Sequence, residues 1–242
     1  MKTKVAVAGA SGRLGSLICS VIESHPEFEL VARLGRNSKK DAALDAEILV
    51  DATNIDASLA IVDTALKRDQ KVIIATSGWS EELIEELRSR VANTPKSGVL
   101  IVPNFSLGSV IGTQIAQIIA PYFDHVEIIE THHSKKIDSP SGTAVRTAEL
   151  IAEARPDNPV TAPFTDQEAR GQLVAGIPVH SLRMSGVVAK QEVRFGAVGE
   201  TLSITHDTVS PDSYIAGIRA SLEAIRDQKG LSVGLAKILG IK

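Results

Sequence analysis

The sequence predicts an α/β protein in which a parallel, doubly wound N-terminal sheet is followed by an α+β domain with a mainly antiparallel sheet. Two observations support the first part: short apolar runs alternate with helical patterns over the first hundred residues, and glycines follow the first run. A third observation supports the second part. Three strand-like runs follow one another late in the chain with short connections, which favours an antiparallel meander.

The first half of the chain predicts a regular order of elements. In sequence they are strand 3–9, helix 13–24, strand 28–33, strand 47–51, helix 56–68, strand 71–75, helix 80–92 and strand 98–102. Parallel strands end at a common edge of their sheet, and ligands of such sheets bind there. Small or polar residues follow three of the strands at 51–53, 75–77 and 103–105, so these loops are expected to face a cofactor.

The turn after the first strand carries glycines at positions 9, 12 and 15. Glycine allows a tight turn and a close approach of phosphate to the backbone, and the helix that follows presents its N-terminus to a pyrophosphate. The spacing Gly-x-x-Gly-x-x-Gly differs from the commoner Gly-x-Gly-x-x-Gly. Its place between an N-terminal strand and a helix nevertheless predicts a Rossmann-type dinucleotide site.

The end of the second strand is basic. An acidic residue there usually binds the ribose hydroxyls of NADH, whereas this chain has Gly35 followed by Arg36, with Arg33, Ser38, Lys39 and Lys40 nearby. Guanidinium and ammonium groups suit a 2′-phosphate, so NADPH is the expected cofactor and NADH a possible one. A basic, solvated loop without a ligand is the alternative.

The second half begins with a helix at 107–120 and a strand at 125–132, followed by a helix at 142–154 and a proline-rich irregular stretch from residue 155. The meander strands are 179–184, 188–195 and 201–206. An amphipathic helix opened by Pro211 runs to about residue 228 and should return to the first domain. We therefore expect a dinucleotide-binding domain of residues 1–105 with 208–242, completed by C-terminal helices, and a substrate-binding and oligomerisation domain of residues 106–207.

The stretch Glu-Thr-His-His-Ser-Lys-Lys-Ile-Asp-Ser-Pro-Ser-Gly-Thr at 130–143 concentrates proton donors and positive charge before a helix. His132, His133 and Lys136 supply them. The run from Ser141 through Gly142 and Thr143 opens the helix, whose unpaired N–H groups favour a carboxylate or phosphate. The histidines could instead be a surface pair or strand residues facing opposite sides. A metal site is not expected, because no compact His or Cys spacing occurs.

Composition narrows the class of protein. A net charge of −3 and basic residues that do not interleave with aromatic ones argue against nucleic-acid binding. The single cysteine, Cys19, excludes a disulfide framework and suits a reducing compartment. Without a secretion signal or a long apolar stretch, we expect a cytoplasmic protein with no membrane span.

The 130–144 stretch closely resembles the signature E-x-H-H-x-x-K-x-D-x-P-S-G-T-A of the dihydrodipicolinate reductase family. The motifs Pro103-Asn-Phe-Ser-x-Gly108, Gly176-Ile-Pro-Val-His-Ser-x-Arg183 and Gly199-Glu-Thr-Leu-Ser-Ile-Thr-His206 extend the resemblance over essentially the whole chain. The resemblance implies NAD(P)H-dependent reduction of 4-hydroxy-tetrahydrodipicolinate to tetrahydrodipicolinate in lysine and diaminopimelate biosynthesis. It also implies a homotetramer built through the sheet of the second domain.

The resemblance assigns roles to matching residues. His132 and Lys136 would transfer protons, while His133, Gly142 and Thr143 would hold the carboxylates of a small dicarboxylate substrate. The cofactor-binding positions, with Arg36 added from the basic loop, are Gly9, Ala10, Ser11, Gly12, Arg13, Leu14, Arg36, Ala75, Thr76, Ser77, Val102, Pro103, Asn104 and Phe105.

The chain departs from the family at Ala52, where Phe is common, and at Ala75, where Gly is common. Both departures concern the cofactor side. Two other functions are left open: another two-domain NAD(P)-dependent reductase, and a protein that binds NADPH without turnover. A semialdehyde dehydrogenase would need a nucleophilic cysteine, and Cys19 lies in the first predicted helix, which is unsuitable.

Overall fold

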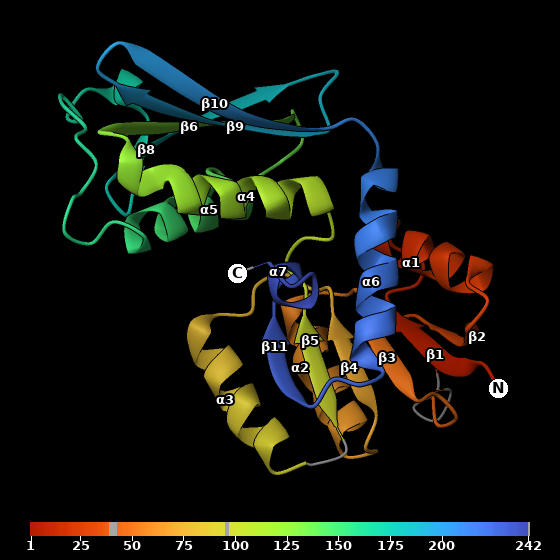
Figure 1. The fold of residues 1–242 in the computed structure, drawn as a ribbon. Coiled ribbons are helices and arrows are strands. Elements are labelled where there is room, and N and C mark those ends of the chain that lie inside the picture. Colours follow the sequence, from red (N-terminus) through yellow and green to blue (C-terminus); the bar gives the residue numbers. More distant parts are fainter. Residues whose placement is uncertain (39–42, 95–96, 242) are drawn as a thin grey trace. The chain divides into compact units, whose positions relative to one another are not determined.

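The computed structural model describes residues 1–38, 43–94 and 97–241. The chain divides into two compact units (Figure 1). The first unit comprises Met1–Ser106 and Tyr214–Lys242, and the second comprises Leu107–Ser213. The predicted fold class is confirmed, since the first unit holds a parallel sheet with helices and the second a mixed, mostly antiparallel one.

The sheet of the first unit has the order β11-β5-β4-β3-β1-β2, and all its neighbouring strands are parallel. The strands are β1 (Thr3–Ala8), β2 (Phe28–Leu34), β3 (Ile48–Asp51), β4 (Lys71–Ile74), β5 (Gly98–Ile101) and β11 (Gly230–Val233). The chain passes from β1 to β2 on one side and then to β3 on the other. This reversal creates a switch point beside β1, where ligands of such sheets bind.

Helices cover both faces of this sheet because alternate strand residues point to opposite sides. On one face, α2 (Ile55–Leu66) and α3 (Glu81–Ala92) pack over residues such as Leu49 and Val72. The helices begin where side chains cap them: Asn54 Oδ1 accepts from the Ala57 N–H, and Ser80 Oγ accepts from the Leu83 N–H.

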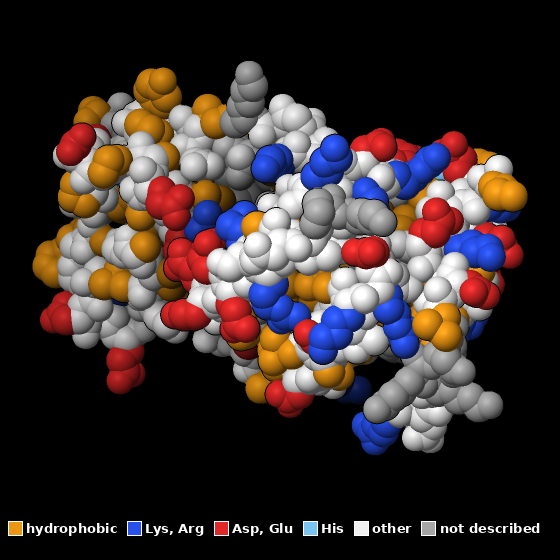
Figure 2. Space-filling model, turned by 90° about the horizontal axis from the view of Figure 1, so that it is seen from below, with side chains coloured by type: hydrophobic (Ala, Val, Ile, Leu, Met, Phe, Trp, Pro, Cys, Tyr) orange, Lys and Arg blue, Asp and Glu red, His pale blue; other side chains and the backbone are white. Residues whose placement is uncertain are grey.

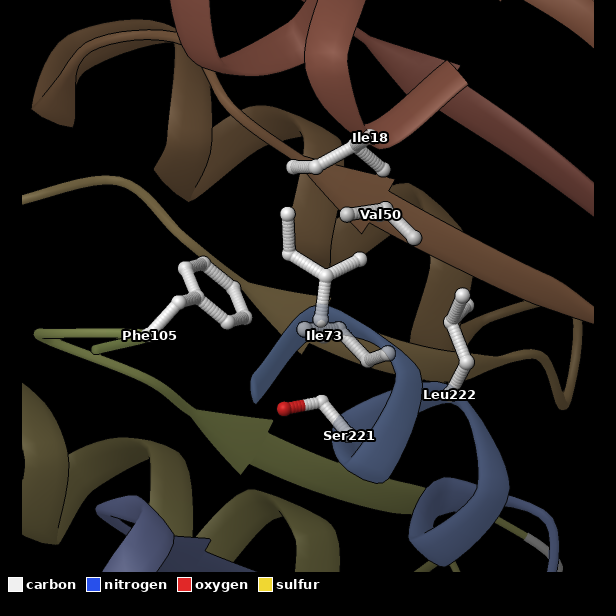
Figure 3. Close-up of a pocket in the computed structure, with 7 residues that line it drawn as sticks. Ile18, Val50, Ile73, Phe105, Ser221 and Leu222 are labelled. Carbon is white, nitrogen blue, oxygen red and sulfur yellow. The ribbon is translucent and has the colours of Figure 1, made fainter. Parts of the chain in front are cut away.

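On the opposite face, α1 (Arg13–Ser24) and α6 (Ile215–Ile225) pack over Val50 and Ile73. Figure 3 shows the small apolar pocket that these elements enclose, with the Phe105 ring directed into it. The pocket leaves no space for a water molecule, so it is part of the hydrophobic core. A four-residue helix, α7 (Leu235–Ile238), follows β11.

The sheet of the second unit has the order β10-β9-β6-β8-β7. Its strands are β6 (His125–His133), β7 (Gln172–Val174), β8 (Ile177–Met184), β9 (Ala189–Ala197) and β10 (Glu200–Thr208). Helices α4 (Leu107–Ile119) and α5 (Gly142–Glu153) cover one face, where Ala116, Ala148 and Ile151 join a core with Ile128 and Phe195.

The predicted three-strand meander is wrong in one pairing. β9 and β10 form the expected hairpin, but β8 does not pair with β9, because β6 lies between them. After β6 the chain crosses through α5 and returns as β8, which is parallel to β6. It then crosses back, so that β9 lies on the opposite side of β6 from β8. Strand order depends on such long-range packing, which a run of neighbouring strand patterns does not reveal.

Smaller differences concern ends and short elements. Pro211 begins a 3-10 turn, Pro211–Tyr214, ahead of α6, which ends at Ile225. β7, β11 and α7 were not predicted, because runs of three or four residues carry too little periodicity. On the face shown in Figure 2, basic and acidic side chains are interspersed. Among the described residues, no helix has the length and apolar character needed to cross a membrane.

Candidate functional site

The glycine turn after β1 lies directly against the loop after β3. Gly9 adopts a φ of +76°, and a Cβ there would lie 2.2 Å from the Ala52 carbonyl oxygen. A Cβ on Gly15 would lie 2.1 Å from the Gly9 carbonyl oxygen. Neither position accepts a side chain, so the turn folds tightly at the switch point and leaves the start of α1 facing the carboxyl edge of the sheet.

The predicted cofactor residues follow three strands that end at this edge: Gly9–Leu14 after β1, Ala75–Ser77 after β4 and Val102–Phe105 after β5. Their side chains differ in accessibility. Ser11, Gly12, Arg13, Ser77 and Pro103 are exposed, whereas Ala10, Thr76, Val102 and Phe105 are buried.

A network of hydrogen bonds fixes the loop after β3. The fully buried Asp51 carboxylate accepts from Thr53 Oγ1 at 2.6 Å and from Ser58 Oγ at 2.5 Å, and the Trp79 indole N–H donates to Ser58 Oγ at 3.1 Å. The Thr53 N–H also donates to Thr76 Oγ1 at 2.9 Å. The loops after β3 and β4 are therefore joined by polar contacts at the edge where a dinucleotide would lie.

The basic segment after β2 is only partly available for a ligand. Arg33 forms an ion pair with Glu23 of α1, with 2.5 Å between Nη2 and Oε1. Ser38 Oγ accepts from the Gly35 N–H at 2.8 Å, which closes a turn. Arg36 is exposed and makes no hydrogen bond or ion pair within the described residues. Lys39 and Lys40 lie outside the described residues.

In the second unit, β6 carries the two adjacent histidines. Residues 128, 130 and 132 share the face that packs against α4 and α5, and strand alternation places His133 on the other face. The two imidazoles therefore do not act as one pair. His132 lies next to Glu130, whose side chain is fully buried, with 2.6 Å between His132 Nδ1 and Glu130 Oε2.

Arg183 of β8 completes the environment of Glu130. Its two terminal nitrogens donate to the two carboxylate oxygens at 2.9 Å and 2.8 Å. Glu130 Oε1 also accepts from the N–H of Ser141, the residue that caps α5, at 3.2 Å. One buried carboxylate thus joins the histidine, a neighbouring strand and the start of a helix.

The loop after β6 brings Lys136 to an acidic partner. Lys136 Nζ donates to both carboxylate oxygens of Asp138, at 2.8 Å and 2.7 Å. The backbone oxygen of Asp138 accepts from Arg183 Nη2 at 2.7 Å. The lysine is therefore tied, through Asp138 and Arg183, to the same group that contacts His132.

The start of α5 follows this loop. Ser141 Oγ accepts from the Ala144 N–H at 3.3 Å, and Gly142 is exposed with open space where a side chain would be. Thr143 is half-buried, and its carbonyl oxygen accepts from Thr147 Oγ1 at 2.8 Å. An exposed first turn with a small residue at its tip is accessible to an anion.

The charges around His132 are reflected in its pKa. Burial lowers the pKa of His132, and the positive charges of Lys136 and Arg183 lower it further, against the opposing effect of Glu130. Burial alone would raise the pKa of Glu130, but hydrogen bonds from Arg183, Ser181 and His132 outweigh it and hold that pKa below its usual value. The hydrogen bond from Lys136 lowers the pKa of Asp138.

Four residues of these networks carry no role that the sequence alone predicts: Glu130, Arg183, Asp138 and Asp51. Glu130 and Asp138 lie inside the signature stretch, and their spacing of two residues from His132 and Lys136 is the only local signal. Arg183 is distant in sequence, and its role follows only from strand pairing. Within the described residues, no three potential ligands gather as they would around a metal ion.

Family models match both halves of the chain. The model described as "Dihydrodipicolinate reductase, N-terminus" matches residues 3–105, and the one described as "Dihydrodipicolinate reductase, C-terminus" matches residues 108–239. The 4-hydroxy-tetrahydrodipicolinate reductase of Clavibacter sepedonicus is 52% identical over 240 residues, which cover 99% of this chain and 87% of the relative. The enzyme of that name from Streptomyces avermitilis is 40% identical over 250 residues, covering 99% of both.

Solved structures agree with this assignment. The dipicolinate-bound dihydrodipicolinate reductase from Paenisporosarcina sp. TG-14 is similar with a TM-score of 0.84 and 29% identity, covering 98% of this chain and 100% of that one. GenD2 from gentamicin A biosynthesis, in complex with NAD, shares the fold alone, with a TM-score of 0.59, 13% identity and coverage of 93% and 86%. The chain belongs to the dihydrodipicolinate reductase family.

Proposed function

We propose that this chain is an NAD(P)H-dependent oxidoreductase that reduces 4-hydroxy-tetrahydrodipicolinate to tetrahydrodipicolinate in lysine and diaminopimelate biosynthesis. The observation that carries this proposal is the arrangement of His132, Lys136 and the start of α5 on one continuous segment. Glu130 joins His132 to the start of α5, and Arg183 links Glu130 to the loop of Lys136. This segment supplies proton-transfer groups and an anion site within a short length of chain. The substrate needs both, because it bears two carboxylates and takes up a proton.

The chain's own residues suit the binding of such a dianion. His133, Gly142 and Thr143 would hold its carboxylates, with the first-turn N–H groups of α5 as donors. Lys136 would add positive charge and serve as one proton donor, after exchanging the Asp138 carboxylate for a substrate group. His132 would transfer a proton at Nε2, because Nδ1 is held by Glu130.

A dinucleotide fits the first unit, since the turn after β1 packs too tightly for a side chain at Gly9 or Gly15 and leads into the start of α1, where a pyrophosphate would rest. When bound, the reduced nicotinamide supplies the hydride. The turn at Gly9–Leu14 would hold the pyrophosphate, while the segments Ala75–Ser77 and Val102–Phe105 would line the nicotinamide end. NADPH is the preferred cofactor in this proposal because exposed Arg36 can pair with a 2′-phosphate, with NADH as the less favoured one.

Three further assignments are part of the proposal. Residues 1–105 with 208–242 would bind the dinucleotide, and residues 106–207 would bind substrate and form a homotetramer. The open face of the second sheet supports such an assembly, because Leu182 and Met184 are 43% and 48% exposed there. The protein would work in the cytoplasm, consistent with its single, unpaired Cys19.

The test is an assay of NADPH oxidation with substrate freshly generated from pyruvate and aspartate semialdehyde, run with and without that substrate. We expect oxidation that depends on the condensation product. Oxidation with aspartate semialdehyde alone would indicate a different reductase. Binding of NADPH without oxidation in the complete mixture would indicate a protein that senses the cofactor without turnover.

A further inference from the structure

Arg183 is placed to control the charge of the group beside His132. Glu130 is fully buried, and its carboxylate accepts hydrogen bonds from Arg183, from the His132 imidazole, from the Ser141 backbone N–H and from the Ser181 hydroxyl. The two parallel hydrogen bonds from Arg183 match both oxygens, the geometry in which a guanidinium pairs most strongly with a carboxylate. His132 therefore lies beside a nearly neutral ion pair rather than beside a bare carboxylate.

This difference matters because a bare carboxylate next to an imidazole favours the protonated, positively charged ring. A guanidinium stays charged at all accessible pH values and cancels that effect. Since the ionised Glu130 can only accept hydrogen bonds, Nδ1 of His132 carries the proton of the neutral ring, and Nε2 has a free lone pair. The hydrogen-bond network thus selects both the tautomer and the charge.

Other charged groups near His132 do not change this conclusion. Lys136 and Asp138, in the loop, form their own ion pair. Helix α4 has no charged residue, and the charged residues of α5 pair with one another. On the neighbouring strand β9, the residue opposite His132 is Ala189, which is uncharged. His206 of β10 is on the same sheet face but is separated from β6 by β9, and burial lowers its pKa. Glu130 is the ionised group that is hydrogen-bonded to His132, and Arg183 is the cation that is hydrogen-bonded to Glu130.

The same guanidinium has a second partner. Arg183 Nη2 donates to the backbone oxygen of Asp138 at 2.7 Å, and the Asp138 carboxylate holds Lys136. One side chain thus connects the strand that bears His132 with the loop that bears Lys136. Removal of Arg183 would release this loop and leave Glu130 buried without a cation.

We propose that Arg183 is a positioning residue with two effects. It neutralises Glu130, so that the His132 imidazole is uncharged in the resting site with Nε2 unprotonated. It also anchors the loop that bears Lys136. This inference rests on the proposed function for its role in turnover. Its electrostatic part does not depend on that function, because the charge of His132 can be measured without substrate.

The experiment is an NMR titration of histidine-labelled protein without ligands, with the His132 signal identified by its loss in a His132→Gln variant. Arg183→Met should move the His132 titration to higher pH, because Glu130 is left unbalanced. Glu130→Gln should move it to lower pH, because Arg183 is left unbalanced. Arg183→Lys keeps the charge and should stay close to the native titration. Arg194→Met, which removes an exposed arginine from β9, is the matched control and should have no effect.

In turnover, the limb of the kcat/KM profile that reports the charge of His132 should move in the same direction as the NMR titration. Arg183→Met should therefore move this limb to higher pH, and Glu130→Gln should move it to lower pH. A folded Arg183→Met with an unshifted His132 titration would overturn the proposal, as would shifts of the same sign in Arg183→Met and Glu130→Gln. If Arg183→Met does not fold, the other two variants test the proposal. It then requires a His132 titration at lower pH in Glu130→Gln and a titration close to native in Arg183→Lys. If the variants show the predicted titrations of His132 but the native protein has no reductase activity, the proposed function is refuted and the role of Arg183 stands.

Discussion

Glu130 Oε2 lies 2.6 Å from His132 Nδ1, two residues along the same strand. The contact follows from strand geometry, because residues two apart project from the same face. It fixes the imidazole ring so that Nε2 is the nitrogen left for a substrate. A histidine oriented by a buried carboxylate is a common arrangement for proton transfer, and here a strand and not a loop provides it.

Loss of either proton-transfer group should slow turnover without loss of cofactor binding. His132→Ala and Lys136→Ala should each lower kcat by about two to four orders of magnitude. His125→Ala on the same strand and Lys135→Ala in the same loop are matched controls and should retain activity. Steady-state kinetics and NADPH titration measure the two properties separately. Near-normal turnover in a folded His132 or Lys136 variant would refute its assigned role.

Thr143 tests the anion site at the start of α5. Thr143→Val keeps the shape of the side chain and deletes its hydroxyl, so substrate binding should weaken by about 1 to 3 kcal/mol if the hydroxyl pairs with a carboxylate. The hydrogen bond that the Thr143 carbonyl oxygen accepts from Thr147 is untouched by this change. The measurement is the KM for substrate at saturating cofactor. An unchanged KM would leave Thr143 as a residue of the helix only.

Arg36 should decide the choice between the two cofactors. One or two charge-assisted hydrogen bonds to the 2′-phosphate would give about a tenfold to thousandfold preference for NADPH. A Gly35→Asp, Arg36→Ala double variant should shift toward NADH, and the open space at Gly35 admits the new side chain. Arg33→Gln is the control, because Glu23 already engages Arg33. Equal use of both cofactors by the native protein would contradict this prediction.

Asp51 should contribute to the stability of the first unit. Asp51→Ala removes the acceptor for Thr53 Oγ1 and for the buried Ser58 hydroxyl, at a cost of about 1 to 3 kcal/mol in the free energy of unfolding. The control is Asp56→Ala, which removes an exposed carboxylate from the first turn of α2. Denaturant unfolding can be followed through Trp79, the only tryptophan in the chain. Equal stabilities of the two variants would mean that the network adds nothing.

The local parts of the fold could be predicted from the sequence. The first strand and helix were predicted within a residue of β1 and α1, because apolar periodicity and glycines are local signals. The pairing of β8 with β6 could not be predicted from the sequence, because it depends on the crossover through α5. The same limit applies to the site, since Glu130 and Arg183 are 53 residues apart and meet only through that pairing.

The basic loop shows a second limit of sequence reasoning. Arg33 and Arg36 are chemically equivalent in the sequence, and both were candidates for the 2′-phosphate. The structure distinguishes them, because Glu23 of α1 lies within reach of Arg33 and not of Arg36. Phe105 likewise was expected at the cofactor, but its ring is buried in the core beside Ile18 and Ile73, so only its backbone is available (Figure 3).

Isotope transfer follows the hydride from the cofactor into the product. NADPH with deuterium at both C4 positions of the nicotinamide would be oxidised by the native protein in the presence of freshly generated substrate, and the product analysed by mass spectrometry and NMR. We expect one deuterium to be carried into the ring of tetrahydrodipicolinate, while the proton at the neighbouring carbon comes from solvent. Oxidised cofactor with no deuterium in the ring product would contradict it.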